Sequence, residues 1–260
     1  MVKERRTNEY LLPWRVRAAM VWRSLFIQAT NNFERMLALG FLFALWPALR
    51  RAYPEPEARR DAVVRHLAFF NTQPYLANSI LGVVAHAELT HDGPSRDEEV
   101  RNLKRAMMGA LGALGDDLFW AGLMPAAALV ALTVFAYRPA WALLGVIAAL
   151  VLYNIGHLWT RVRLFELSLR YGRRITRVFK LLRLPRVVVA VKLAGAFLLG
   201  VFAVTAAAGG GGADARSWAT AVAFGGAVVG ALLLQRLGVR PGWCWLAVTA
   251  AATAGGALVR

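Results

Sequence analysis

The chain has 260 residues, of which 58% are hydrophobic and 18% are charged, and its mean hydropathy is +0.47. A soluble domain carries about 25% charged residues and a disordered chain is polar, so this composition argues against both classes. The single cysteine, Cys244, cannot form an internal disulfide, and the fold therefore does not depend on oxidised sulfur.

The net charge of +16 comes from 31 basic and 15 acidic residues, which are distributed differently along the chain. Thirteen of the acids lie at or before Asp117, whereas the basic residues are divided nearly evenly between the two halves. The second half is therefore apolar, with basic segments between its hydrophobic stretches. We expect its basic residues to contact anionic membrane lipid and not nucleic acid.

The first 26 residues mix charges into an apolar stretch and contain no small-residue cleavage site, so no signal peptide is expected. This predicts that the N-terminus stays in the cytoplasm. In residues 14–26, basic and aromatic side chains alternate at helical spacing, which is typical of a helix on a membrane surface. A solvated helix that packs on its own protein explains the pattern equally well.

Two further helical segments are predicted in the first half. Residues 37–49 are apolar but too short to cross a bilayer about 30 Å thick, which favours a buried or re-entrant segment. A second helix is expected to begin after Pro54 and Pro56. Within it, Asp61 and Arg65 have the i,i+4 spacing of an ion pair.

The part of the chain after Asp117 contains longer apolar segments. Each has about the length of a membrane-spanning helix, and their many glycines and alanines suit close helix packing in lipid. The predicted spans are 118–136, 140–159, 187–208, 217–234 and 243–259. We therefore expect an all-α polytopic membrane protein, with amphipathic and re-entrant helices in residues 1–117 and a bundle of about five transmembrane helices in residues 118–260.

Residues 160–186 are expected to form a cytoplasmic basic loop within that bundle. They contain nine basic residues and one acid, Glu166, and an excess of positive charge marks the cytoplasmic side. Counting spans from this loop agrees with a cytoplasmic N-terminus. The prediction is a multi-pass protein of the inner (cytoplasmic) membrane.

The sequence contains no short catalytic or phosphate-binding motif and no pair of cysteines. Its four histidines are scattered, at His66, His86, His91 and His157. We therefore expect no catalytic residue, no bound metal and no cofactor in this chain.

Polar residues within apolar surroundings are better functional candidates, because a buried polar group is costly unless it is paired. Three clusters stand out: Asn31, Asn32, Glu34 and Arg35; Asn71, Thr72, Gln73 and Pro74; and Gly115, Asp116 and Asp117. The uncharged donors and acceptors of the second cluster fit a ring of sugar hydroxyls. Each cluster also has a plainer explanation, which is mutual neutralisation for the first, a helix break for the second and a helix N-cap for the third.

Four segments, NNFERMLALGF, RRAYPE, RHLAFFNTQP and GALGALGDDLFW, follow one another over roughly residues 20–130. In order and approximate spacing they resemble the IID membrane subunit of the mannose/fructose/sorbose-family sugar phosphotransferase system. The resemblance implies an all-helical permease subunit that forms, with a IIC partner, the membrane path for a hexose. It also implies that separate IIA and IIB proteins carry the phosphoryl group and that the complex is a trimer of IIC–IID pairs.

By position, the resemblance implies roles for residues of the first two clusters. The implied substrate-binding residues are Asn32, Glu34, Asn71, Thr72 and Gln73. For the remaining residues of the three clusters we expect a gating or structural role: Asn31, Arg35, Pro74, Gly115, Asp116 and Asp117. Three positions depart from the family pattern, with Asn31 in place of a Trp, Ala68 in place of a Glu and Asp117 in place of a Pro. Because an aromatic ring stacks on a sugar, its absence supports an alternative, a structural or regulatory membrane subunit that binds IIC or lipid without contacting sugar.

Overall fold

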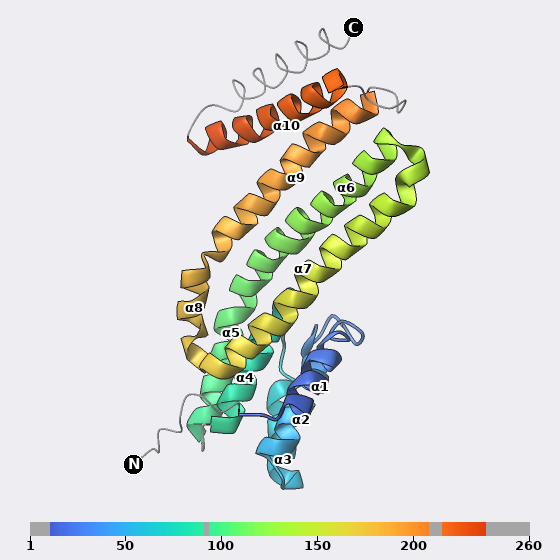
Figure 1. Ribbon diagram of the computed structural model, residues 1–260. Coiled ribbons are helices and arrows are strands. Elements are labelled where there is room, and N and C mark those ends of the chain that lie inside the picture. The colour runs from blue at the N-terminus through green and yellow to red at the C-terminus, as the bar shows by residue number, and fades with distance from the viewer. Residues whose placement is uncertain (1–10, 91–93, 208–214, 238–260) are drawn as a thin grey trace. The chain divides into compact units, whose positions relative to one another are not determined.

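The computed structural model describes residues 11–90, 94–207 and 215–237, in which every regular element is a helix (Figure 1). This confirms the all-α prediction. The elements, in chain order, are α1 (Trp14–Ser24), α2 (Ala38–Ala52), α3 (Pro56–His66), α4 (Ala77–Thr90), α5 (Pro94–Gly115), η1 (Asp116–Leu123), α6 (Met124–Tyr137), η2 (Pro139–Trp141), α7 (Ala142–Tyr171), η3 (Gly172–Arg174), α8 (Ile175–Leu182), α9 (Leu184–Ala207) and α10 (Ala215–Arg236).

The chain divides into two compact units. The first unit comprises Met1–Gly115 and His157–Arg183, and the second comprises Asp116–Gly156 and Leu184–Arg260. A division between Gly115 and Asp116 lies close to the expected boundary at residue 117. Residues 157–183, however, group with the N-terminal helices and not with the later apolar ones.

The core of the first unit is built around α2. Phe41 and Leu45 of this helix are fully buried, and Phe41 packs against Phe70 with ring centroids 4.3 Å apart. A Cβ at Gly40 would lie 2.1 Å from the carbonyl oxygen of Ile27, so only glycine fits this approach. The prediction that the apolar segment is buried is confirmed, and α2 has 15 residues, too few to cross a bilayer.

Helix α1 combines the two properties that its pattern allowed. On one side Met20 is fully buried and Arg17 forms an ion pair with Glu166 of α7. On the other side the indoles of Trp14 and Trp22 are 66% and 63% exposed. The helix therefore packs on its own unit and still presents an aromatic face outward.

The segment 160–186, expected to be a loop, is helical instead, because α7 continues to Tyr171 and α8 follows. Leu164, Phe165 and Leu169 recur at helical spacing and are buried. The chain turns at Gly172, whose φ of +50° is the left-handed conformation in which helices commonly end. The charge count identified the basic segment, but it carried no information on the helical spacing of the buried apolar residues within it.

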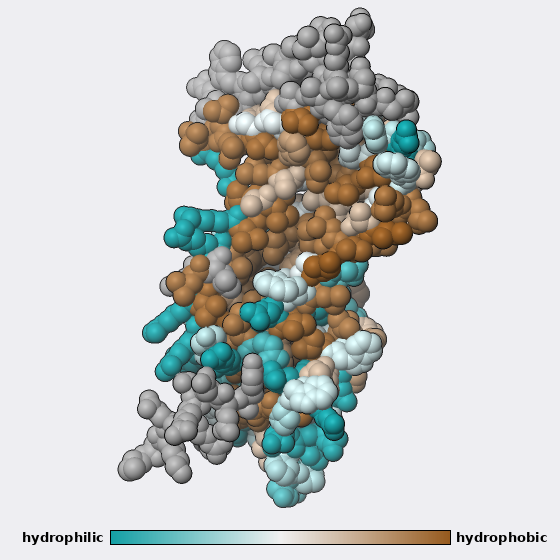
Figure 2. Space-filling view, in the orientation of Figure 1, coloured by the Kyte–Doolittle hydropathy of each residue, from teal (hydrophilic) through white to brown (hydrophobic). Residues whose placement is uncertain are grey.

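The second unit contains apolar helices with exposed side chains. Three stretches of the described chain are long and apolar enough to cross a membrane: Arg96–Tyr137, Pro139–Phe179 and Leu184–Ala206. Figure 2 shows hydrophobic side chains spread over the surface of α6, α7 and α9. These stretches include the first two predicted spans and the third as far as Ala206. The fourth lies in α10, which has a shorter apolar stretch at Phe224–Leu234, and the fifth, 243–259, falls outside the described residues.

Candidate functional site

The first polar cluster forms a tight loop between α1 and α2. The Oδ1 atom of Asn32 accepts hydrogen bonds from the backbone nitrogens of Glu34 and Arg35, at 3.1 and 2.8 Å. The backbone nitrogen of Met36 donates to the carbonyl oxygen of Asn32 at 2.9 Å, and Met36 has a φ of 52°. Asn32 thus shapes the loop through its own side chain, as Asn does in many turns. Residues 31–35 are all exposed, and Phe33 is 98% exposed.

The structure brings this loop together with the second cluster. Leu37 donates its backbone N–H to the carbonyl oxygen of Phe70 at 2.8 Å, and Phe70 donates to the carbonyl oxygen of Arg35 at 3.3 Å. Met36 and Phe70 form a parallel β-bridge. Two segments that are 35 residues apart in sequence are therefore joined by backbone hydrogen bonds, which places Asn71 directly after the bridge and exposed.

The remaining residues of the second cluster are buried, and they stabilise the fold. Thr72 donates from Oγ1 to the carbonyl oxygen of Met108 at 3.0 Å. The Oε1 atom of Gln73 accepts from the backbone nitrogens of Tyr75 and Leu76, at 2.7 and 3.1 Å, and so caps the chain where it enters α4. The Nε2 atom of Gln73 is buried and has no hydrogen-bond partner among the described residues.

The third cluster is divided between the two units. Gly115 packs on the second cluster, since a Cβ at this position would lie 2.5 Å from the Cβ of Gln73. Asp116 and Asp117 belong to the second unit, where Asp117 accepts a hydrogen bond from Lys192 at 2.6 Å. Helices α5, η1 and α6 follow without a break, so the two aspartates do not cap a helix start and that explanation is wrong.

A buried charged cluster in the first unit was missed by the reasoning from sequence. The carboxylate of Glu88 on α4 has a side-chain exposure of 0%. It accepts hydrogen bonds from Tyr53 at 2.5 Å, from Arg65 at 3.0 and 3.1 Å, and from His66 at 2.8 Å. Arg65 also pairs with Asp97 at 2.6 Å, so the i,i+4 pair expected with Asp61 gives way to these tertiary partners.

The protonation states of this cluster follow from burial and from these bonds. Burial alone would raise the pKa of Glu88, but the hydrogen bonds from His66 and Tyr53 and the charge of Arg65 lower it to about 2. Burial lowers the pKa of His66, so its ring is neutral and Nε2 donates to Glu88. The Nδ1 atom of His66 is buried and has no hydrogen-bond partner in the described part of the chain, as a neutral ring permits.

The charged cluster is connected to the paired polar segments. Lys104 lies 5.2 Å from the ring centroids of both Phe41 and Phe70, and it donates to the carbonyl oxygen of His66 at 3.4 Å. Glu88 and Lys104 therefore fix the end of α3 and the Phe70 ring, four residues later, from two sides. One signal in the sequence pointed to this cluster, because Glu88 is the only acid in the apolar stretch 75–89.

Within residues 11–90, 94–207 and 215–237, no three His, Cys, Asp or Glu side chains come together as metal ligands do. The exposed part of this arrangement offers the amides of Asn32 and Asn71 and the carboxylate of Glu34 on a hydrogen-bonded backbone scaffold. Such groups suit recognition of an uncharged polar molecule.

Comparison with known sequences decides the family. The profile of the PTS system mannose/fructose/sorbose family IID component matches residues 14–208. The chain belongs to this family. The match includes all three polar clusters and confirms the resemblance seen in the sequence motifs.

Individual relatives of this IID component carry sugar names. The mannose-specific EIID component of Escherichia coli K12 is 42% identical over 142 residues, which cover 54% of this chain and 49% of that protein. The sorbose-specific EIID component of Lacticaseibacillus casei is 30% identical over 178 residues, 68% of this chain and 62% of that protein. The chain thus matches about half the length of the Escherichia coli relative.

Two solved structures are similar over nearly the whole chain. A chain of the mannose transporter ManYZ in complex with microcin E492 is 28% identical, with a TM-score of 0.58 over 96% of this chain and 98% of that one. A second structure, described as a membrane protein, is 27% identical, with a TM-score of 0.66 over 95% of this chain and 97% of that one. Both likenesses agree with a helical membrane protein.

Proposed function

We propose that this IID component is a permease subunit that, with a IIC partner, binds a mannose-like hexose and moves it across the membrane. Phosphoryl transfer takes place on IIA and IIB proteins and not on this chain. The proposal is supported by the mannose and sorbose names of its relatives and by the likeness to the mannose transporter ManYZ. The three apolar stretches of the described chain that are long enough to cross a bilayer support the membrane location.

The observation that carries the proposal is the backbone pairing of the loop at 31–36 with the segment that begins at Phe70. It gathers Asn32, Glu34 and Asn71 on one exposed edge of the first unit. Amides and a carboxylate at such an edge match the donors and acceptors of a hexose. A membrane partner that covers this edge would exclude water and strengthen those bonds, because hydrogen bonds are stronger where the dielectric is low.

The buried residues have a supporting role in this proposal. Thr72 and Gln73 hold the edge in place through their bonds to α5 and to the start of α4, and Pro74 is buried between them and α4. Gly115 lets α5 approach Gln73 closely. The buried Nε2 of Gln73 is the one of their side-chain donors left for a sugar or a partner in the described structure.

The same proposal covers the surroundings of the subunit. It lies in the inner membrane with its N-terminus in the cytoplasm, contacts membrane lipid, and assembles as a trimer of IIC–IID pairs. The basic residues between 160 and 186 support this orientation, since positive charge concentrates on the cytoplasmic side.

One observation favours a second candidate, a structural or regulatory membrane subunit that binds IIC or lipid without touching sugar. The Thr72 hydroxyl and the Gln73 amide oxygen already form hydrogen bonds within the chain, which leaves them little capacity to bind a sugar. In addition, Asn31 stands where the family resemblance leads us to expect an aromatic ring. Under this second candidate the polar edge serves only to assemble the complex.

Hexose binding by the purified complex of this chain with its IIC partner separates the two candidates. Under the first, Glu34→Gln and Asn71→Ala each weaken calorimetric binding by about tenfold, the effect of one lost hydrogen bond. Glu57→Gln, at an exposed acid on α3, is the control and leaves binding unchanged. Wild-type affinity in both edge variants, with an intact complex, would establish the second candidate instead.

A further inference from the structure

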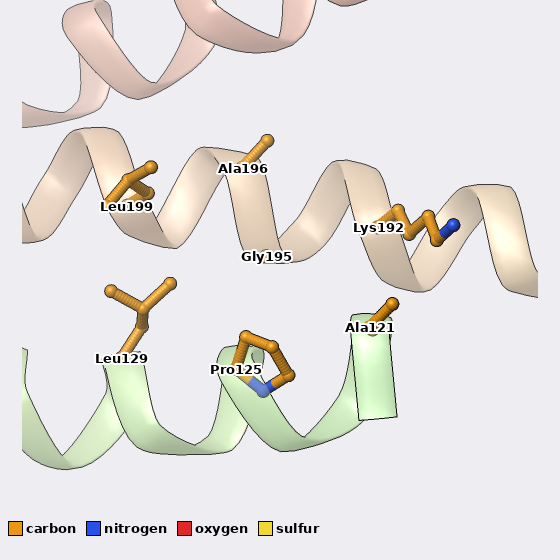
Figure 3. A pocket seen from close by; sticks show the side chains of 8 residues that line it. Ala121, Pro125, Leu129, Lys192, Gly195, Ala196 and Leu199 are labelled. Atoms are coloured by element: carbon orange, nitrogen blue, oxygen red, sulfur yellow. The ribbon is translucent and has the colours of Figure 1, made fainter. Parts of the chain in front are cut away.

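A groove runs between α6 and α9 in the second unit (Figure 3). It has a volume of about 190 Å³ and is lined almost entirely by apolar or small residues. From the α6 side it is bounded by Ala121, Pro125 and Leu129, and from the α9 side by Lys192, Gly195 and Leu199. Among the described residues, Lys192 supplies the one charged group of this lining.

Small residues produce this groove. A Cβ at Gly122 would lie 3.1 Å from Cγ1 of Val191, so η1 and α9 approach closely there. A Cβ at Gly195 would lie 3.7 Å from the Cβ of Ala126, an ordinary contact that leaves space beyond it. The helices are thus held close together while a hollow remains between their facing side chains.

One end of the groove is polar and the rest is not. Lys192 and Asp117 form an ion pair of 2.6 Å at this end, and their side chains are 39% and 56% exposed. Figure 3 shows Lys192 pointing away from Leu199, toward the N-terminal part of α9. A lysine that points along an apolar helix brings its charge toward the membrane surface. The groove therefore has the polarity of an amphiphile, with a charged end followed by an apolar length.

This polarity selects among ligands. A hexose needs many hydrogen-bonding partners, and apart from Lys192 the groove lining offers almost none. A lipid acyl chain matches the apolar length, which spans about 10 Å from Lys192 to Leu199 along the helix. Lys192 and Asp117 present opposite charges side by side at this end, so it favours a headgroup that also carries both signs.

We propose that the groove binds a phospholipid whose headgroup carries a phosphate and a primary ammonium, with one acyl chain along α6 and α9. Lys192 has donors beyond the one given to Asp117 and takes the phosphate, while the free lone pairs of Asp117 accept from the ammonium. An anionic headgroup has no ammonium to pair with Asp117, and its uncompensated negative charge is repelled by that carboxylate. A choline headgroup carries the positive charge but has no N–H to donate.

Asp117 distinguishes this site from the family pattern, because the family resemblance predicts a proline at this position. A proline there would leave Lys192 without its carboxylate partner. The inference rests on the part of the proposed function that places α6 and α9 in a bilayer. It does not depend on whether the polar edge of the first unit binds sugar.

The test is native mass spectrometry of the full chain, delipidated in detergent and supplied with dioleoyl phosphatidylethanolamine, phosphatidylglycerol or phosphatidylcholine. The wild type should retain phosphatidylethanolamine about five- to tenfold better than the other two lipids, the gain from one extra charge-assisted hydrogen bond. Asp117→Asn leaves Lys192 unpaired and should reverse the preference toward phosphatidylglycerol. Gly195→Leu fills the groove and should abolish selective retention.

Glu99→Gln, which removes the ion pair to Arg173 in the first unit, is the matched control and should bind as the wild type does. Equal retention of the three lipids by the wild type would overturn the proposal. So would an Asp117→Asn variant with unchanged preference, a result that remains decisive if Gly195→Leu fails to fold. Hexose binding measured on the same variants tests the proposed function separately. If it persists while lipid selectivity is absent, the lipid proposal fails and the proposed function is unaffected.

Discussion

Replacing Glu88 by glutamine should destabilise the protein more than any other single charge neutralisation in the first unit. Glutamine keeps the shape of the side chain, but it loses the charge and turns an NH₂ group toward donors on Tyr53, Arg65 and His66. Breaking a buried ion pair by removing one partner costs about 3–5 kcal/mol. Arg65 retains Asp97 at 2.6 Å, so we expect a value near the lower limit, about 3 kcal/mol.

The pKa of Glu88 gives an independent magnitude. A fall from the ordinary 4.5 to about 2 corresponds to about 3 kcal/mol of stability. Because the folded-state pKa is the lower one, this stability is fully present above pH 4.5. It is lost as the pH falls from 4.5 toward 2, where the folded state must also take up the proton. The glutamine variant has no such proton to bind.

Thermal unfolding of the detergent-solubilised protein, followed by circular dichroism, measures both effects. At pH 7 the Glu88→Gln variant should melt about 6–12 °C below the wild type, and at pH 3 the gap should shrink by more than half. Glu57→Gln, at an exposed position, should melt with the wild type at both pH values. A Glu88→Gln variant within 2 °C of the wild type at pH 7, or a gap that persists at pH 3, would refute the reasoning.

Three further substitutions test the scaffold of the polar edge. Gly115→Ala should lower the free energy of unfolding by about 1–3 kcal/mol, because its Cβ would clash with Gln73. Gly109→Ala, on the same helix, meets nothing within 4 Å and should raise it by about 0.5–1 kcal/mol. Melting temperatures that change in the same direction in both variants would contradict this. Thr72→Val should cost about 1 kcal/mol and Thr72→Ser much less, by the same measurement. Asn32→Ala should speed hydrogen exchange at the amides of the loop, whereas Asn32→Asp keeps the acceptor and their protection; equal rates in both variants would count against the turn.

Hydrophobic patterning was sufficient to predict the helices and the burial of α2, since these depend on local periodicity and length. It was not sufficient for residues 160–171. There the charge count predicted a loop, while Leu164, Phe165 and Leu169 follow a helical stripe that is buried in the first unit. The two signals overlap in one segment, and the apolar stripe determines its structure.

The candidate site shows a second limit. The motifs that contain Asn32 and Asn71 were recognised separately, but their spacing does not predict that Met36 and Phe70 pair. That contact forms only because α2 and α3 reverse the direction of the chain and bring the two segments together. Arg65 was assigned a partner one helical turn away. Its actual partners are 23 and 32 residues along the chain, where burial makes an ion pair far stronger than on a solvated helix surface.

The division of the first unit into two separated stretches has a consequence for biosynthesis. Gly82 of α4 lies against the backbone of Phe165, and Ser79 bonds Ser168 at 2.7 Å, so this face of α4 is completed only by α7. A ribosome must first deliver residues 116–156, including α6 and half of α7, before those partners emerge. Until then Ser79 and Gly82 of α4 lack these native contacts. The first unit therefore cannot complete its folding before residues 116–156 of the second unit have been synthesised.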